Sequence, residues 1–387
     1  MRFPEFSGEW KKCKFGDIAT GFDYGMNAAA KPFDGENKYI RITDIDEASS
    51  TYNDKDIVSP DGRLTDNYVV NDRDILLART GASTGKSYLY RKSDGKLYYA
   101  GFLIRANITE HNPYFVFSQL HTHRYWRWVS IMSARSGQPG INSQEYSSFP
   151  IFTTSLHEEN KISTLLSLLN ERIVTQNKII EKYESLIKGL SQQLLSSEND
   201  WILYRLDDLA QIKSGYSGTQ VGYQTPYKVS RIETISKHCV DIQRIGYVEY
   251  IPESYKLNVG DILFSNINSV QYIGNTAYLD KDYGLYHGMN LLRIIPNTTI
   301  VRPRFLHLLL CTDWAINHFQ TICNKAVSQA SINQTALGKS RFPIPPMSVQ
   351  QQICSMFELT ERKLDNEKKY RSYLQQQKWY LFQEMFI

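Results

Sequence analysis

The stretch Gly81-Ala-Ser-Thr-Gly85-Lys86-Ser87 has residue types that could cradle a phosphate, and it follows an apolar run at 75–78. A phosphate-binding loop needs four residues between its two glycines, and Thr80 stands where the first glycine would be. Residues 88–91 favour a strand over the helix whose N-terminus would face the phosphates. We therefore expect no nucleotide site here. We expect a polar loop that presents four side chains to a polyanion: Arg79, Thr80, Ser83 and Lys86.

Other candidates for catalysis or metal binding are weak. His121 and His123 alternate, but on a helix such residues diverge by about 200°, and no cysteine or carboxylate cluster completes a metal site. We interpret both as surface histidines. Asp17 and Asp208 recur 191 positions apart, which favours a capping role. No GxSxG, DPPY-like or nuclease constellation is present, so the sequence predicts no catalytic residue, metal or cofactor in this chain.

Polar and aromatic loops carry the stronger signal. They mix Arg and Lys with Asn, Gln, Ser, Thr and some of the 26 tyrosines, side chains that suit contacts with base edges and phosphates. For any single residue an ordinary polar loop is the favoured interpretation, but the set occurs in two parallel copies, which favours recognition. The remaining candidates for DNA binding are Arg135, Gln138, Asn142, Lys213, Tyr216, Gln220, Asn266, Asn268, Gln271, Tyr272, Lys325, Gln329 and Asn333.

Two long helices are predicted to position these loops. From Ile162 to Leu194 an apolar residue recurs in steps of four and three, with Gln176 as the polar interruption. Adding 191 gives a second, patchier series from Ile353 to Met385. Such heptad spacing predicts helices with a narrow buried stripe, each about 57 Å long for about 38 residues. A small domain cannot cover that length, so we expect the helices to pack on each other.

The repeat extends beyond the helices. Residues 10–19 match 201–210, Asp74-Ile-Leu matches Asp261-Ile-Leu, and Phe149-Pro-Ile matches Phe342-Pro-Ile, whereas 21–63 has only a vague counterpart. We expect strands at 38–45, 74–79, 86–91 and 98–108, and helices that begin at Pro113 and Pro303 and run to about Met132 and Cys323. The predicted fold is α/β, with two globular domains at 1–156 and 199–347 and long helices at 157–198 and 348–387.

Composition sets further bounds. The 387 residues suffice for two domains, and no apolar run resembles a signal peptide or a membrane span. Five cysteines without a CxxC pair favour reduced thiols in the cytoplasm. The net charge of +4 is compatible with nucleic acid binding but is also common among enzymes.

Together these motifs resemble the specificity subunit of a type I restriction–modification system. Each half opens with Trp-x4-(Phe/Leu)-x-Asp-(Ile/Leu)-Ala and contains an Asp-Ile-Leu strand and an Ile-Asn…Phe-Pro-Ile turn. Each half ends in a long helix entered through Glu158-Glu159-Asn160 or Gln350-Gln351-Gln352. The resemblance covers nearly the whole chain.

The resemblance implies a non-catalytic subunit that reads a bipartite site on double-stranded DNA, with antiparallel helices as a ruler between two recognition domains related by a pseudo-two-fold repeat. It also implies two adenine methyltransferase subunits that bind S-adenosylmethionine, and restriction and translocase subunits that use ATP and Mg²⁺. The chain itself would hold no cofactor and would not contact a membrane. Trp379, Tyr380 and Phe382 are expected to be exposed and are candidates for docking the methyltransferase, although simple helix packing would explain them equally well.

Two other interpretations stay open at this point. A self-contained methyltransferase or nuclease would need a cofactor or metal motif that the sequence does not show. A coiled-coil adaptor that joins two protein-binding domains would need no affinity for DNA.

Overall fold

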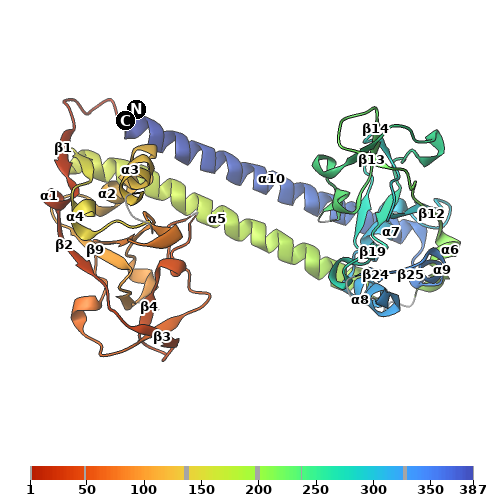
Figure 1. Cartoon of the computed structure of the whole chain (residues 1–387), viewed down its shortest axis with the longest axis horizontal. Coiled ribbons are helices and arrows are strands. Elements are labelled where there is room, and N and C mark those ends of the chain that lie inside the picture. Colours follow the sequence, from red (N-terminus) through yellow and green to blue (C-terminus); the bar gives the residue numbers. More distant parts are fainter. Residues whose placement is uncertain are drawn as a thin grey trace. The chain divides into compact units, whose positions relative to one another are not determined.

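The chain divides into two compact units. The computed structural model describes residues 2–47, 49–134, 139–196, 201–236, 238–325 and 329–386. Unit 1 comprises Met1–Asn177 together with Lys369–Ile387, and unit 2 comprises Lys178–Lys368. Figure 1 labels the helices and strands of both. Among the helices in these ranges, none is long and apolar enough to span a membrane.

The two long helices are α5 (Leu156–Leu194) and α10 (Met347–Met385). Each has 39 residues, and their bounds differ by the same 191 positions that relate the two halves of the sequence. Each begins within two residues of the sequence-based prediction. The heptad spacing is therefore a reliable guide to both helices.

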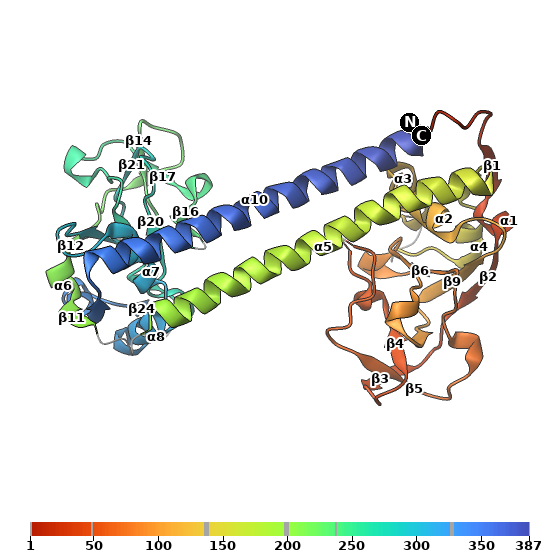
Figure 2. The same ribbon diagram turned by 180° about the vertical axis from the view of Figure 1, so that it is seen from behind.

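Within unit 1 the seam of α5 packs on the seam of α10. Lys378 Nζ donates to Asn170 Oδ1 at 2.9 Å, and Arg371 Nη1 donates to Asn177 Oδ1 at 3.5 Å. The order of these contacts makes the helices antiparallel in unit 1, where they lie side by side (Figure 2). The buried apolar side chains of this seam are Ile162, Leu166, Leu169 and Ile173 of α5 with Leu374, Leu381 and Met385 of α10.

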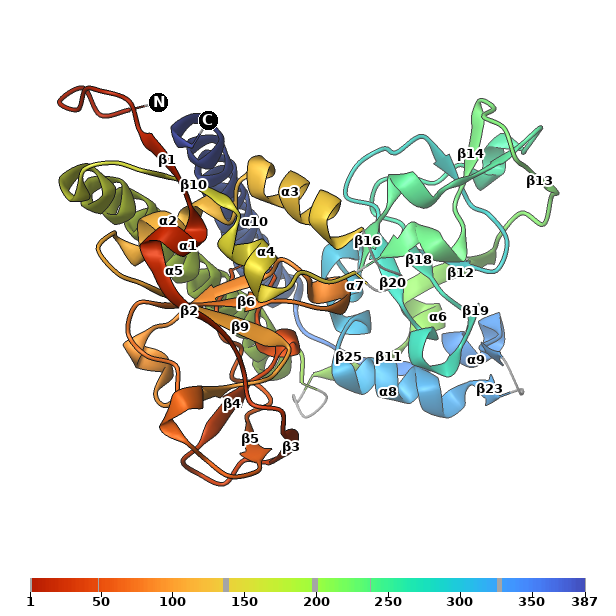
Figure 3. The same cartoon turned by 60° about the vertical axis from the view of Figure 1, so that its left-hand side comes forward.

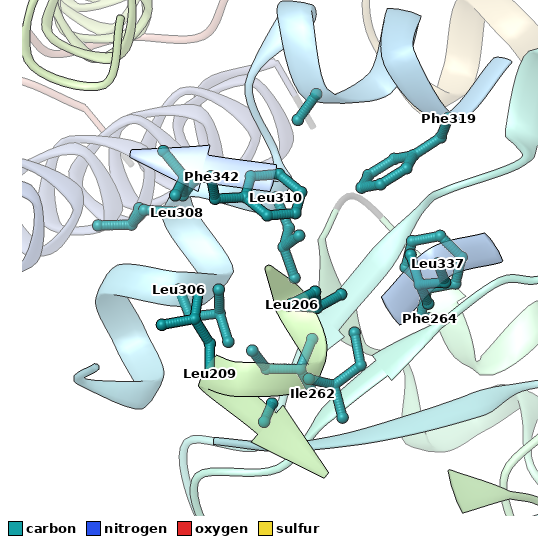
Figure 4. Close-up of a cluster of buried hydrophobic side chains, with 14 of the residues drawn as sticks. Leu206, Leu209, Ile262, Phe264, Leu306, Leu308, Leu310, Phe319, Leu337 and Phe342 are labelled. Atoms are coloured by element: carbon teal, nitrogen blue, oxygen red, sulfur yellow. The ribbon is translucent and has the colours of Figure 1, made fainter. Parts of the chain in front are cut away.

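In unit 2 the other ends of these helices join the core of the domain. Ile353 and Phe357 of α10 are buried in the same cluster as Leu206 and Phe305, and Ile187 of α5 packs against it. Figure 4 shows part of this cluster. A single apolar stripe therefore ties each long helix to a globular domain, which removes its surface from water.

Both units contain the same antiparallel four-stranded sheet. The strand order is β2-β9-β6-β7 in unit 1, where β2, β9 and β6 run side by side (Figure 3), and β12-β22-β18-β20 in unit 2. These strands are β2 (Ala19–Tyr24), β9 (Leu103–Ile108), β6 (Asp74–Ala78) and β7 (Ser87–Leu89), and β12 (Ala210–Ser214), β22 (Leu292–Pro296), β18 (Ile262–Phe264) and β20 (Thr276–Tyr278).

Smaller pairings also recur. A two-stranded antiparallel pair closes each domain: β1 (Lys11–Lys14) with β10 (Pro150–Thr153), and β11 (Ile202–Arg205) with β25 (Arg341–Ile344). A parallel pair lies in each: β4 (Lys38–Ile40) with β8 (Leu97–Tyr99), and β14 (Tyr227–Val229) with β21 (Leu285–Tyr286).

The remaining strands belong to one unit only. They are β3 (Ala29–Pro32) with β5 (Val58–Asp61) in unit 1, and in unit 2 β13 (Gln220–Val221), β17 (Gly246–Val248), β15 (Ile235–Ser236), β16 (Cys239–Val240), β19 (Ile267–Asn268), β23 (Asn324–Lys325) and β24 (Ala330–Ser331). The short helices recur in pairs: α1 (Phe15–Ile18) and α6 (Leu206–Leu209), and α4 (Ser143–Ser147) and α9 (Gln334–Gly338).

The helices predicted to begin at Pro113 and Pro303 are each two helices. In unit 1 they are α2 (Pro113–Gln119) and α3 (His123–Ser133), and in unit 2 they are α7 (Pro303–Leu310) and α8 (Asp313–Ile322). Thr122 Oγ1 accepts from the Tyr125 amide and Thr312 Oγ1 from the Ala315 amide, both at 3.3 Å. The threonine cap starts a new helix in each unit, which the aromatic spacing did not reveal.

Two of the predicted strands are also shorter than expected. The stretch 38–45 forms β4 and then the 3-10 turn η1 (Ile42–Asp44). The stretch 98–108 contains the end of β8, a turn and β9. After β4 the apolar residues continue because Ile45 is buried beyond the turn, whereas Phe102 in the turn after β8 is exposed.

One buried side chain pins the start of each long helix to the neighbouring helix. In unit 1 Glu159 is fully buried, and its carboxylate accepts from the Asn112 amide at 2.9 Å and the Thr154 amide at 3.2 Å. In unit 2 the equivalent Gln350 is also fully buried, and its Oε1 accepts from the Arg302 amide at 2.8 Å. The equivalent amides of Asn112 and Arg302 thus donate to a carboxylate in one unit and to a side-chain amide oxygen in the other.

This pairing predicts that unit 1 tolerates an amide at position 159. We expect Glu159→Ala to lower the free energy of unfolding by about 2–4 kcal/mol, because it leaves buried amides without acceptors. Glu159→Gln should cost only about 1 kcal/mol. Urea denaturation measures both, with the exposed Glu181→Ala on α5 as the control. Equal losses for the two Glu159 variants would contradict the assignment.

Candidate nucleic-acid interface

The first candidate loop in unit 1 follows β6. It forms the 3-10 turn η3 (Gly81–Ser83) and leads into the strand β7, so no helix N-terminus faces the glycines. The expectation of a strand rather than a helix after the glycines is confirmed. The Ile141 amide donates to the Arg79 carbonyl at 2.9 Å, and the Gly81 amide donates to the Pro139 carbonyl at 3.0 Å. The loop therefore lies directly beside the segment 139–142.

Arg79 is held at the start of this loop. Its Nε donates to the Gly101 carbonyl at 3.1 Å, and its guanidinium lies 4.7 Å from the ring centre of Tyr24. The Tyr24 hydroxyl in turn accepts from the Ser143 amide at 3.3 Å. Tyr24 is exposed and was missed by the sequence analysis, because nothing in its neighbourhood repeats in the second half. The Arg79 guanidinium therefore forms a cation–π contact with the Tyr24 ring at the surface.

The other members of this loop differ in their surroundings. Thr80 and Ser83 are half-buried. Lys86 Nζ lies 3.2 Å from Glu47 Oε2, so an exposed carboxylate offsets its charge. Arg135 and Gln138 lie outside the described residues. Of the predicted cations in the described part of unit 1, Arg79 is thus the one without a carboxylate partner.

Asn142 and Asn333 have equivalent structural roles. Asn142 Oδ1 accepts from the Glu145 amide at 2.9 Å, and Asn333 Oδ1 accepts from the Ala336 amide at 2.8 Å, which caps α4 and α9. Capping alone accounts for the repetition of these residues. The predicted capping by Asp17 and Asp208 is confirmed, because their Oδ2 atoms accept from the Lys14 and Arg205 amides at 2.8 and 3.3 Å.

In unit 2 the corresponding loop forms a small sheet. Strand β24 pairs with both β19 and β23, and the Ile332 amide donates to the Asn266 carbonyl at 2.9 Å. This sheet brings together Asn266, Asn268 and Lys325, with Gln329 just before β24 and Asn333 just after it. Lys325 and Gln329 are exposed.

The amides in this sheet are partly engaged. Asn268 Nδ2 donates to Ser265 Oγ at 3.1 Å, and Asn268 Oδ1 accepts from the Ser269 amide at 2.8 Å. Asn266 Nδ2 donates to the Ile332 carbonyl at 3.3 Å, while its Oδ1 is buried and has no hydrogen-bond partner in the described part of the chain. Gln271 and Tyr272 follow on the exposed turn η8 (Val270–Tyr272).

A cavity of about 380 Å³ opens beside this sheet. Its lining combines one carboxylate, two amides, a hydroxyl and a tyrosine with two isoleucines: Glu233, Asn268, Asn275, Ser265, Tyr272, Ile232 and Ile235. Only Asn268 and Tyr272 of these were candidates from sequence. Donors and acceptors around an open cavity can recognise a polar, planar group.

The other candidates in unit 2 lie outside this sheet. Lys213 is exposed on β12, opposite Arg293 of β22. Tyr216 follows β12 and is half-buried, with its ring centre 5.4 Å from that of Tyr255. Gln220 lies on β13, opposite Val248 of β17. The structure thus groups the other candidates around the β19-β24-β23 sheet and leaves these three elsewhere in unit 2.

The docking candidates on α10 differ in exposure. Trp379 is 65 % exposed and Tyr380 is 49 % exposed, but Phe382 is only 7 % exposed. The prediction that Phe382 is exposed is wrong, because its ring lies 6.0 Å from His121 and 6.4 Å from Phe386 in the core of unit 1. On α10 it neighbours the seam residue Leu381, which points into that core.

His121 also departs from its prediction. It lies just beyond α2, and its two ring nitrogens are 2.9 Å from the Phe117 carbonyl and from Ser50 Oγ. Of the two, His123 is exposed as predicted, whereas His121 is half-buried. No group of three or more metal-ligating side chains occurs among the residues that the structure describes.

The sequence analysis missed a turn that both units share. In unit 1 it runs from Arg41 to Asp44, and in unit 2 from Arg231 to Thr234. The Arg41 amide donates to Asp44 Oδ2, and the Arg231 amide donates to Thr234 Oγ1, both at 2.8 Å. The signal was a bare Arg-Ile dipeptide 190 positions apart, inside stretches that otherwise diverge.

Comparisons of the sequence with known proteins point to one family. The family described as type I restriction modification DNA specificity domain matches residues 198–376. A proposed type I restriction enzyme MjaX specificity subunit of Methanocaldococcus jannaschii is 42 % identical over 163 residues, which are 41 % of this chain and 38 % of that protein. The MjaVIII specificity subunit of the same organism is 20 % identical over 98 % of this chain and 91 % of its own length.

Solved structures share the fold. The S subunit of a type I restriction–modification system from M. genitalium has a TM-score of 0.61 at 14 % identity, and covers 98 % of this chain and 96 % of its own. A chain from a study of complex assembly and conformational transition of the type I R-M system has a TM-score of 0.60 at 14 % identity, with 96 % of both chains covered. At this identity the likeness concerns the fold.

His287 supports one of the candidate residues and makes unit 2 sensitive to pH. Its carbonyl accepts from the Tyr216 amide at 2.9 Å, and its ring Nε2 lies 2.9 Å from the Leu291 carbonyl. The side chain is 1 % exposed, and burial lowers the pKa of His287 to about 4. The imidazole is therefore neutral in the folded protein at pH 7, because a buried imidazolium would lose its hydration.

We expect this histidine to destabilise the protein in acid. Its contribution to stability is fully present above the unfolded pKa of about 6.5 and is lost as pH falls toward 4. Between pH 7.5 and 5 the loss should be about 2 kcal/mol. Urea denaturation at both pH values should show a shallower pH dependence for His287→Gln than for the wild type. The exposed His123→Gln serves as the control, and an unchanged pH dependence in His287→Gln would refute this account.

Proposed function

The chain belongs to the specificity subunits of type I restriction–modification systems, and from this premise we propose that it reads DNA for partner enzymes and has no catalytic activity of its own. The observation that carries the proposal is the family match over residues 198–376, which includes the whole loop sheet and cavity of unit 2. Short loops above a sheet present amide, lysine and tyrosine side chains there. These side chains suit contacts with base edges and phosphates.

We propose further that the DNA site has two halves, one for each unit. The frame is the same in both: Asp17 and Asp208 cap the first short helix, and Glu159 and Gln350 pin the long helix. The loops placed on that frame differ. Where unit 1 has Arg79 after the central strand, unit 2 has Asn266. One scaffold with two sets of readers would recognise an asymmetric site.

We also propose that two methyltransferase subunits, which bind S-adenosylmethionine, and ATP- and Mg²⁺-dependent restriction subunits act on the site that this chain selects. A surface in unit 1 supports protein docking. Its residues on α5 and α10 are exposed and apolar, and we call them the aromatic face: Leu165, Leu168, Tyr370, Tyr373 and Tyr380. Trp379 is also exposed, but it lies about 100° round α10 from Tyr380. Work on chromosomal DNA would place the assembly in the cytoplasm.

The aromatic face is continuous by heptad geometry. Leu165 precedes the seam residue Leu166 of α5, and Tyr370 precedes the seam residue Arg371 of α10. In an antiparallel pair these flanking positions meet on one side, and the Arg172 guanidinium lies 5.6 Å from the Tyr370 ring centre. Leu168, Tyr373 and Tyr380 continue the same side at helical spacing. Contiguous exposed apolar surface of this kind is typical of protein interfaces.

The DNA-reading role predicts how two exposed lysines behave. With methyltransferase subunits present, Lys213→Ala with Lys325→Ala should weaken duplex binding for all sequences alike and reduce the salt dependence of log K by about two. Fluorescence anisotropy over a salt series measures this, with the exposed Lys188→Ala on α5 as the control. Absence of salt-sensitive duplex binding in every assembly would favour a coiled-coil adaptor instead, and methylation by the chain alone would favour a self-contained enzyme.

The aromatic face predicts a separate loss. Tyr373→Ala with Tyr380→Ala should weaken binding of the methyltransferase subunits at least about tenfold, because exposed aromatic side chains dominate such interfaces. Sedimentation or calorimetry reports the assembly. The control is Tyr250→Ala, which removes a tyrosine of similar exposure, 63 %, from unit 2. Wild-type affinity in the double variant would remove this face from the docking surface.

A further inference from the structure

The turn that both units share displays one exposed residue. The residues at its start and end, Arg41 and Asp44 or Arg231 and Thr234, are bonded to each other as described above. Between them, Thr43 in unit 1 and Glu233 in unit 2 are exposed. The frame of the turn is common to both units while the displayed residue changes, which is the pattern expected of a specificity position.

In unit 2 the turn has a rigid base. Thr234 is fully buried, and its Oγ1 donates to the Arg244 carbonyl at 2.8 Å. The Asp241 amide donates to the Thr234 carbonyl, also at 2.8 Å. Glu233 is therefore an exposed side chain on a fixed backbone, an arrangement that limits the entropy lost when the carboxylate binds a partner.

Glu233 faces amide groups across the cavity. Asn275 lines the same cavity, and its backbone is fixed because its amide donates to the Tyr272 carbonyl at 3.2 Å and its carbonyl accepts from the Ser265 amide at 2.8 Å. Within the described ranges the Asn275 side chain makes no hydrogen bond. Tyr272 is 51 % exposed at the rim. The cavity lining thus combines a carboxylate that is paired with Arg231 of the same turn, an amide side chain without a hydrogen bond in the described ranges, and an aromatic ring.

Arg231 pairs with the carboxylate without covering it. Its Nε lies 3.4 Å from Glu233 Oε2, and both side chains are about half exposed. An ionised carboxylate only accepts hydrogen bonds. In the major groove cytosine and adenine present an exocyclic amino group, whereas guanine and thymine present carbonyl oxygens. A carboxylate therefore favours the amino bases and repels the keto bases.

We propose that this cavity of unit 2 reads one base through its exocyclic amino group, with Glu233 as the acceptor and Asn275 as its neighbour. The inference rests on the proposed DNA-reading function and specifies the chemistry of one position in one half-site. Unit 1 has Thr43 at the position of Glu233. At the position of Asn275, directly after a glycine of positive φ, unit 1 has Lys86, which is paired with Glu47. The other half-site should therefore not depend on an acidic reader.

The test maps adenine methylation by single-molecule sequencing in a host without other adenine methylation. The wild-type chain, Glu233→Gln and Asn275→Ala are each expressed with the methyltransferase subunits. We expect the wild-type motif to contain cytosine or adenine at the position that the variants change. In Glu233→Gln, discrimination against guanine and thymine there should fall about 5- to 150-fold, while the other half of the motif stays the same. Asn275→Ala should relax the same position.

Two controls separate charge and folding from base reading. Glu249→Gln makes the same change of charge on an exposed carboxylate of unit 2 that binds the Tyr223 hydroxyl outside the cavity, and should leave the motif intact. Thermal melting should show Glu233→Gln to be as stable as the wild type, because its side chain is exposed.

The outcomes are distinct. An unchanged motif in both cavity variants, or a guanine or thymine at the affected position of the wild-type motif, would overturn the inference while leaving the DNA-reading function intact. A wild-type chain that directs no sequence-specific methylation would refute the proposed function itself.

Discussion

Burial of one apolar stripe along each long helix is the constraint on which this structure depends. A 39-residue amphipathic helix is not stable alone in water, so α5 and α10 need partners along their length. In unit 1 they partner each other, and in unit 2 their other ends enter the domain core. The polar contacts Asn170–Lys378 and Asn177–Arg371 interrupt the stripe in unit 1. Polar groups in a helix seam cost stability but disfavour shifted registers, in which they would lose their partners.

The repeated frame is held by interactions with the backbone. Glu159 and Gln350, Thr122 and Thr312, and Asp17 and Asp208 each satisfy main-chain amides, so their roles persist whatever loops lie above them. Such contacts place few demands on the neighbouring side chains. The loops after β6 and β18 can therefore differ in every exposed residue while the sheet beneath keeps its order. This division between frame and surface would allow the two units to have different specificities, as proposed above.

The candidate interface has few charged side chains. In unit 1 Arg79 stacks on Tyr24 while Lys86 is paired with Glu47. In unit 2 an open carboxylate, Glu233, stands among amides. A carboxylate at a DNA-binding surface would repel the phosphates. A specific hydrogen bond from a base to that carboxylate would have to offset the repulsion. The weak net charge of the chain fits an interface that relies on such specific contacts and on partner subunits for affinity.

The sequence alone determined the repeat, the α/β class and both long helices, because these depend on spacing: an offset of 191 and a heptad period that no other fold element imitates. Only the tertiary structure decided which side chains remain at the surface. Phe382 is next to a seam residue and is drawn into the core of unit 1, and Lys86 meets a glutamate 39 positions earlier. The sequence did not reveal the turn that carries Glu233. Its hydrogen bond joins a backbone amide to a side-chain oxygen, which either Asp or Thr can supply, so the two copies share almost no sequence signal.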